Sequence, residues 1–217
     1  MNLAKARAKA MRETLSEEFV EEWARLSGVD LNLGAIDMNG PLARASRRDD
    51  LAVAAVAIWL KGRKWYEARV LADEIYGRAD AMLTRKNMEK LFSGVEDSLR
   101  RLKSAGLRLA IATNETRKAA EGVTDALAIR ELFDFFVGAD DVQNPKPSAD
   151  MVLKACEGCG CQPSEAVIIG DQPMDLLAGR RASLGAVVAV KSSTVTEREV
   201  MELADAVIDS VAELDAF

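Results

Sequence analysis

Apolar residues recur every three or four positions along the first 28 residues, amid many Lys, Arg and Glu side chains. This spacing predicts an amphipathic helix. We expect a break near residues 14–16, where Ser16 can cap a second helical piece. A turn-rich segment from Gly28 to Gly34 follows, and we take residues 1–32 as an N-terminal helical segment. The apolar positions are Ala4, Ala8, Met11, Leu15, Phe19, Trp23 and Leu26.

The polar face of this predicted helix carries both signs of charge, which argues against binding to a membrane surface. We expect the helix to pack on the body of the protein or on a second copy of the chain. The large apolar side chains of Phe19 and Trp23 favour a homodimer formed through it.

Helical spacing also dominates residues 43–92, which predicts a compact helical insert. Trp59, Trp65 and Tyr66 cluster in it, and packing between helices is favoured over stacking on a cofactor. Basic side chains at Arg44, Arg47, Arg48, Arg63 and Lys64 suit either an anionic substrate or a solvated surface.

From residue 94 onward, short apolar runs alternate with helical patterns. Strands are expected at 107–112, 133–137, 166–169, 185–190 and 206–208, and an earlier short run ends at Asp37. Strands that alternate with helices predict an α/β fold with a doubly wound parallel sheet.

The most informative stretch runs from Ala166 to Asp175. Four apolar residues predict a buried strand, Gly170 allows a tight exit, and Asp171 and Asp175 follow. Open α/β sheets bind ligands at the carboxyl edge of their strands, where these acids suit a hard cation such as Mg²⁺. Alternatively, one of the two aspartates caps the following helix.

Polar residues follow other strands in the same way. Thr113 and Asn114 come directly after one expected strand, where they suit either chemistry or the cap of the next helix. Lys146 lies between two prolines in an extended loop, which makes it a candidate for binding an anion. Asp37 and Asn39, taken alone, form an ordinary turn signal.

Composition narrows the classes of function. The chain has 217 residues, 49% of them hydrophobic, so a substantial core is expected. The net charge of −6 argues against non-specific binding to nucleic acid. Absence of histidine removes the usual general base and the usual zinc ligand. Without a membrane-length apolar run or a signal-peptide pattern, we expect a soluble, cytoplasmic protein.

Three cysteines, Cys156, Cys159 and Cys161, lie within six residues near a predicted helix end. A metal site would need a fourth ligand, which no histidine supplies. Reduced thiols are therefore favoured over a metal centre.

Four segments together carry a resemblance to a known family. The chain resembles members of the haloacid dehalogenase superfamily, in the subgroup of small phosphatases similar to phosphoglycolate phosphatase. The resemblance covers about residue 33 to the end. It implies a Rossmann-like core at 33–42 and 93–217 and a small α-helical cap at 43–92, inserted after the first strand. The matching segments are Asp37-Met38-Asn39-Gly40-Pro41-Leu42, Ala112-Thr113-Asn114, Asn144-Pro145-Lys146-Pro147 and Ile169-Gly170-Asp171 through Asp175.

The resemblance implies a role for each matching residue. Asp37 would attack phosphorus and become an aspartyl-phosphate. Mg²⁺ would be held by Asp37, the main-chain carbonyl of Asn39 and Asp171, with Asp175 supporting that shell. Lys146 would offset the negative charge of the substrate phosphate, Thr113 would donate a hydrogen bond to it, and Asn114 would orient the substrate.

The first motif departs from the family pattern at two positions. Family phosphatases carry an aspartate where this chain has Asn39, and this aspartate protonates the leaving group and activates water. An amide cannot move a proton, and general acid–base catalysis typically contributes about 10²–10⁴-fold. Pro41 stands where the family usually has a threonine, which removes a hydroxyl and an N–H group near the phosphate.

Two functions from different classes follow. The first is a Mg²⁺-dependent phosphatase acting on a small phosphorylated metabolite, slowed by Asn39. The second is a catalytically impaired protein of the same fold that binds a phosphorylated ligand or a protein partner. A dehalogenase is a weaker third interpretation, because the phosphatase subgroup is the closer match.

Overall fold

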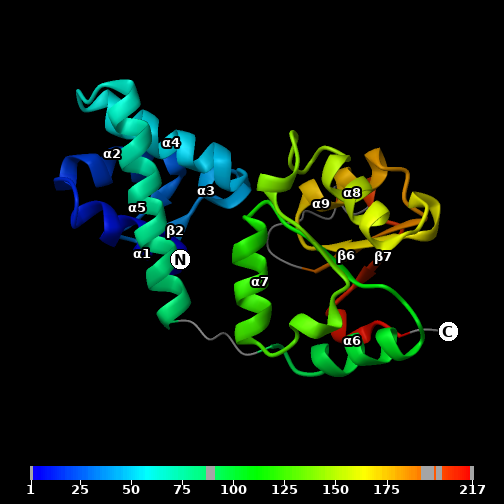
Figure 1. Cartoon of the computed structure of the whole chain (residues 1–217). Helices are drawn as coiled ribbons and strands as arrows, with labels where there is room; N and C mark the ends of the chain where they lie inside the picture. The colour runs from blue at the N-terminus through cyan, green and yellow to red at the C-terminus, as the bar shows by residue number, and fades with distance from the viewer. Residues whose placement is uncertain (1, 87–90, 192–197, 199–201, 216–217) are drawn as a thin grey trace. The chain divides into compact units, whose positions relative to one another are not determined.

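The computed structural model describes residues 2–86, 91–191, 198 and 202–215 (Figure 1). The chain divides into two compact units, Met1–Met88 and Glu89–Phe217. Within the described residues, no helix combines the length and the apolar character that crossing a bilayer requires.

The first unit consists mainly of helices. The expected break in the N-terminal helix is present: Ser16 has extended backbone angles and separates α1 from α2. Gly28 ends α2 in the left-handed conformation, at φ 72°, which glycine adopts without steric cost. The helices of this unit are α1 (Asn2–Arg12), α2 (Glu17–Ser27), α3 (Pro41–Arg44), α4 (Arg47–Leu60) and α5 (Trp65–Lys86).

The core of this unit is built around Trp23 and Tyr76, which are both fully buried. The Trp23 indole N–H donates to the Tyr76 hydroxyl at 3.1 Å, and this hydroxyl lies 3.1 Å from the Asp50 carboxylate. Arg7 forms an ion pair with Asp50, and its guanidinium lies 4.2 Å from the centre of the Tyr76 ring. Trp23 and Phe19 are thus used inside the unit, so neither supplies the free apolar surface on which the homodimer expectation depends.

A short hairpin connects α2 to α3. Strand β1 (Val29–Asp30) pairs antiparallel with β2 (Ala35–Ile36), so that Val29 lies opposite Ile36. Residues 33–42 were expected in the parallel core, whereas in the structure they belong to the first unit and β2 has β1 as its partner. The physical reason is local: only a few residues separate the two strands, so the hairpin closes before a distant strand is needed.

Residues 43–92, which were expected to form a helical cap, are mainly helical where the structure describes them. Ser46 caps α4 by accepting a hydrogen bond from the Asp49 N–H at 3.2 Å. A single long helix, α5, spans Trp65–Lys86, and residues 87–90 lie outside the described residues. Trp59 and Trp65 are each 49% exposed, and they border a surface hollow with Val56. Their aromatic rings therefore pack only in part.

The second unit contains the parallel strands that the sequence predicts. Strand β3 (Ala110–Ala112) pairs with β4 (Phe135–Val137), and β5 (Val167–Gly170) pairs with β6 (Ala186–Val190), which also pairs with β7 (Ala206–Ile208). Every pairing among these five strands is parallel. Their carboxyl ends are followed by the polar segments identified in the sequence, as expected for an α/β fold that binds ligands at this edge.

Helices pack on these strands from more than one side (Figure 1). Helix α8 (Asp150–Cys159) contacts β3 and β4, and α9 (Pro173–Arg181) contacts β5 and β6. Side chains of α9 and β6, among them Leu176 and Val187, form one buried cluster. The remaining helical segments are α6 (Val95–Ser104), α7 (Arg117–Ala126), η1 (Arg130–Leu132), η2 (Ala139–Asp141), η3 (Pro163–Glu165) and η4 (Val211–Glu213).

Candidate active site

One asparagine side chain joins the end of β3 to the loop after β4. The Asn114 amide nitrogen donates to the Lys146 carbonyl oxygen at 2.9 Å, and the Lys146 main-chain N–H donates to Asn114 Oδ1 at 3.0 Å. The same amide nitrogen lies 3.1 Å from the Met174 sulfur. Asn114 was expected to orient a substrate, but here its side chain holds the backbone that carries the lysine.

The Lys146 ammonium group lies in a polar pocket of main-chain and carboxylate oxygens. It donates to the Ala112 carbonyl oxygen at 2.7 Å and to Asp175 Oδ1 at 2.5 Å. The Lys146 side chain is 9% exposed and that of Asp175 is 11% exposed. Because a buried charge is costly without a partner, this ion pair fixes the position of the lysine head group.

Two aspartates follow β5, and a glycine lets them approach the strand. A Cβ atom at Gly170 would lie 2.3 Å from Asp175 Cβ, so no other residue fits there. Asp175 accepts a hydrogen bond from the Gln172 N–H at 3.1 Å. Asp171 remains exposed, but the protein around its carboxylate raises its pKa by desolvation, and the negative charge of Asp175 raises it further.

Thr113 lies at the start of the loop after β3. Its main-chain N–H donates to the Val137 carbonyl at 2.9 Å, which extends the pairing of β3 with β4 by one residue. Its hydroxyl oxygen accepts from the Glu115 N–H at 3.1 Å, so the hydroxyl proton can still be donated to a ligand. The cap of α7 is Thr116, which accepts from the Ala119 N–H. Thr113 and Asn114 therefore do not serve as that cap.

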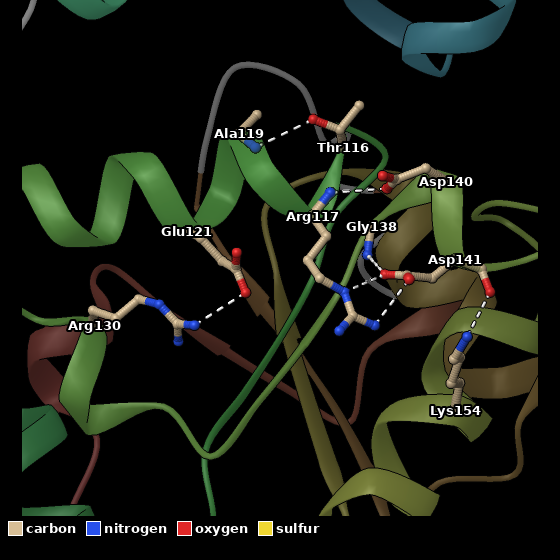
Figure 2. A network of polar contacts seen from close by, with 9 residues as sticks. All are labelled: Thr116, Arg117, Ala119, Glu121, Arg130, Gly138, Asp140, Asp141 and Lys154. Atoms are coloured by element: carbon tan, nitrogen blue, oxygen red, sulfur yellow. Dashed lines mark hydrogen bonds and ion pairs between the residues drawn. The ribbon is translucent and has the colours of Figure 1, made fainter.

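A network of polar contacts joins the loops after β3 and β4 (Figure 2). The Arg117 guanidinium donates to both carboxylate oxygens of Asp141 at 2.8 Å, and its main-chain N–H donates to Asp140. Asp141 also accepts from the Gly138 N–H, and its carbonyl oxygen accepts from the Lys154 ammonium at 2.6 Å. The hydrogen bonds from Arg117 lower the pKa of Asp141.

This network was not predicted from the sequence, although the sequence contains a signal for it. Arg117 is the first residue of α7, where a positive charge is unfavourable next to the helix dipole unless an acid offsets it. Asp140 and Asp141 follow the neighbouring strand and supply that acid. A side chain at Gly138 is excluded, because a Cβ atom would lie 2.1 Å from the Arg117 nitrogen.

The remaining expected site residues, Asp37 and Asn39, belong to the first unit. Asp37 follows β2, and its side-chain oxygen accepts from the Asn39 N–H at 2.9 Å. Its own main-chain N–H donates to the Gly28 carbonyl at 2.7 Å. Both side chains are exposed, and Asp37 borders a hollow of about 400 Å³ together with Arg25 and Asp30. The structure therefore gives Asp37 the geometry of a turn.

The second unit alone brings together Asn114, Lys146, Asp171 and Asp175, with Thr113 adjacent. Oxygen ligands of this kind suit a hard divalent cation. Asp171 fits direct coordination, because a cation would relieve its repulsion from Asp175. In the described parts of the chain, no three Cys, Asp or Glu side chains lie close enough to form a cage made only of protein.

Comparison with known proteins shows the family to which the chain belongs. Residues 64–189 match the model of the haloacid dehalogenase-like hydrolase family. A phosphoglycolate phosphatase from Chromobacterium violaceum is 29% identical over 164 residues, which cover 67% of this chain and 71% of the relative. Pyrophosphatase PpaX from Bacillus velezensis is 37% identical over 91 residues, 42% of each chain. The chain thus spans less than half of several curated relatives that it matches.

Solved structures show the same fold at lower sequence identity. β-Phosphoglucomutase from Clostridium difficile superimposes with a TM-score of 0.71 at 21% identity, covering 98% of this chain and 87% of that protein. At this identity the likeness concerns the fold alone. The match to the family model covers more than half of the sequence and includes the segments that carry Thr113, Lys146 and Asp171. The chain belongs to the haloacid dehalogenase-like hydrolase family.

Proposed function

We propose that the protein is a Mg²⁺-dependent phosphatase that hydrolyses a small phosphorylated metabolite. One observation carries the proposal: the Lys146 ammonium is held between the Ala112 carbonyl oxygen and the Asp175 carboxylate. It lies near Asp171, a carboxylate whose pKa is raised by desolvation. A cation at Asp171 and the fixed positive charge of Lys146 together offset the charge of a phosphoryl group. The phosphoglycolate phosphatase and pyrophosphatase relatives support a phosphorylated substrate.

In this proposal each residue has a defined task. Mg²⁺, when bound at Asp171, neutralises negative charge on the phosphoryl oxygens. Lys146 binds the same group, and the Thr113 hydroxyl donates a hydrogen bond to it. Asp175 holds Lys146 in place. The nucleophile assigned from the first motif is Asp37, which would form an aspartyl-phosphate, with the Asn39 carbonyl as a further metal ligand.

Asn39 limits the chemistry that this set of residues can perform. Because its amide cannot transfer a proton, esters with good leaving groups should react, whereas alkyl phosphates should react poorly. We therefore expect turnover of an aryl phosphate and an acyl phosphate with Mg²⁺. Replacing Asn39 with Asp should extend activity to alkyl phosphates.

Variants of the second unit test the proposal directly. Lys146→Met and Asp171→Asn should each reduce turnover of p-nitrophenyl phosphate by at least about 100-fold, as expected for loss of a group that stabilises transition-state charge. Lys118→Met and Asp97→Asn are matched controls, since both side chains are exposed and neither belongs to the site. Equal activity in all four variants would refute a site at this edge of the sheet.

A second function is favoured by the surroundings of Asp37. This residue lies in a turn after an antiparallel hairpin, and its neighbour in the motif is an amide. Both features suit a protein that binds a phosphorylated ligand at Lys146 and Asp171 without hydrolysing it. Native protein that binds inorganic phosphate in a Mg²⁺-dependent manner, yet turns over no activated ester, would establish this alternative.

Unchanged turnover in Asp37→Asn would place the nucleophile elsewhere.

A further inference from the structure

Helix α8 ends in a turn that brings two of the three cysteines together. The Cys161 N–H donates to the Cys156 carbonyl at 3.1 Å, and the Gly160 N–H donates to the Glu157 carbonyl at 3.0 Å. Gly160 is in the left-handed conformation, at φ 68°. This pair of hydrogen bonds defines a Schellman motif, in which the side chains at its two ends contact each other. Here those side chains are thiols.

The geometry is close to that of a disulfide. The Cys161 thiol donates to the Cys156 carbonyl oxygen, with 3.7 Å between Sγ and O. The hydrogen bond from Cys161 N to Cys156 O is 3.1 Å long. Together with standard bond lengths, it limits the distance between the Cα atoms of Cys156 and Cys161 to about 7 Å. Disulfides span roughly 4.4–6.8 Å between Cα atoms. Both cysteines are free thiols in the structure.

The two thiols differ in access to solvent. Cys156 is buried, whereas Cys161 is partly exposed and can meet a small oxidant. Burial and the neighbouring Cys161 raise the pKa of Cys156 to about 11. Cys159 is also buried, and burial, followed by the neighbouring Cys161, raises the pKa of its thiol. The exposed thiol is therefore the one that reacts first, with Cys156 as its nearest partner.

We propose that Cys156 and Cys161 form a reversible redox site, which a peroxide oxidises to an intramolecular disulfide. Cys161 sulfur first attacks the peroxide, so that an S–O bond forms, the O–O bond breaks and water leaves. Cys156 sulfur then attacks the Cys161 sulfenic acid, so that the S–S bond forms, the S–O bond breaks and a second water leaves with the Cys156 proton. The two thiols lose two electrons in total, and the peroxide is reduced to two waters.

This site lies at the opposite end of α8 from the Lys146 loop. The helix begins at Asp150, a few residues after Lys146, and its ten residues span about 15 Å. Oxidation should consequently leave phosphatase turnover within about twofold of the reduced protein, while it secures the last turn of α8 against local opening. The redox site therefore stands independently of the proposed phosphatase function.

The full chain treated with hydrogen peroxide tests the proposal. We expect one of three thiols to remain reactive after denaturation, a mass loss of two hydrogen atoms, and a peptide cross-linked between Cys156 and Cys161. Dithiothreitol should restore three thiols. Cys159→Ser should still form the cross-link, whereas Cys161→Ser should slow the loss of thiols by at least about tenfold, since the accessible thiol is removed.

A second variant keeps the proposal testable if Cys161→Ser fails to fold. Cys156→Ala keeps the buried position apolar, and it should accumulate a sulfenic acid at Cys161 without forming a cross-link. A disulfide that includes Cys159, covalent dimers as the main product, or independent oxidation of all three thiols would overturn the proposal.

Discussion

Asn114 and Lys146 exchange two hydrogen bonds although 32 residues separate them in the chain. The amide of Asn114 thereby fixes the backbone of the residue that is proposed to bind phosphate. The Asn114 side chain therefore acts on turnover through the position of Lys146. Removing this side chain should alter turnover more than substrate affinity.

Asn114→Ala should lower kcat by about tenfold or more, because the lost hydrogen bonds leave the Lys146 backbone free to shift. KM for an aryl phosphate should change little. Asn144→Ala is the matched control, since its exposed amide bonds only to Asp150. A rise in KM with unchanged kcat would instead assign Asn114 to substrate binding.

Lys146→Met should destabilise the fold as well as reduce activity. The substitution leaves Asp175, whose side chain is almost buried, without its ion-pair partner. Such a change typically costs about 3–5 kcal/mol of stability. Urea denaturation measures this loss. The double variant Lys146→Met/Asp175→Asn should recover part of it, because the stranded charge is removed. Stability equal to that of the Lys118→Met control would contradict a role for this ion pair.

Asp171→Asn should stabilise the metal-free protein near neutral pH. The pKa of Asp171 is raised in the folded state, so the folded state disfavours the charged form of this side chain. The folded protein therefore loses stability as the pH rises through the ordinary pKa and then the raised pKa. The gain in thermal midpoint should vanish in acid, where the carboxyl group is neutral in both states. Added Mg²⁺ should stabilise the native protein but not the variant.

The Arg117–Asp141 contact gives the opposite dependence on pH. Arg117 lowers the pKa of Asp141, so this carboxylate contributes stability above its ordinary pKa, and the contribution is lost as pH falls through the lowered value. Arg117→Ala should cost about 1–3 kcal/mol at neutral pH and should weaken this acid-side dependence. Arg100→Ala removes an exposed pair with Glu96, for which we expect less than about 1 kcal/mol.

Much of the local structure follows from contiguous sequence. Ser16 separates two helices as its position indicated, and the apolar run before Gly170 forms a strand that ends at Gly170, next to Asp171. These features depend on neighbouring residues, and a Cβ at Gly170 would clash with a side chain only five residues away. The parallel sheet, the family and the segments around Lys146 and Asp171 were therefore predictable.

The contacts that define the site required the tertiary structure. The bonds from Asn114 to Lys146 and the bonds from Arg117 to Asp141 each depend on which segments meet in space. A sequence pattern reports the side-chain period and the ends of an element, but it does not name the partner. Thus the sequence by itself determined which residues lie at strand ends. Only folding decided that Asn114 supports the lysine and that Arg117 binds Asp141, because these contacts depend on packing between distant parts of the chain.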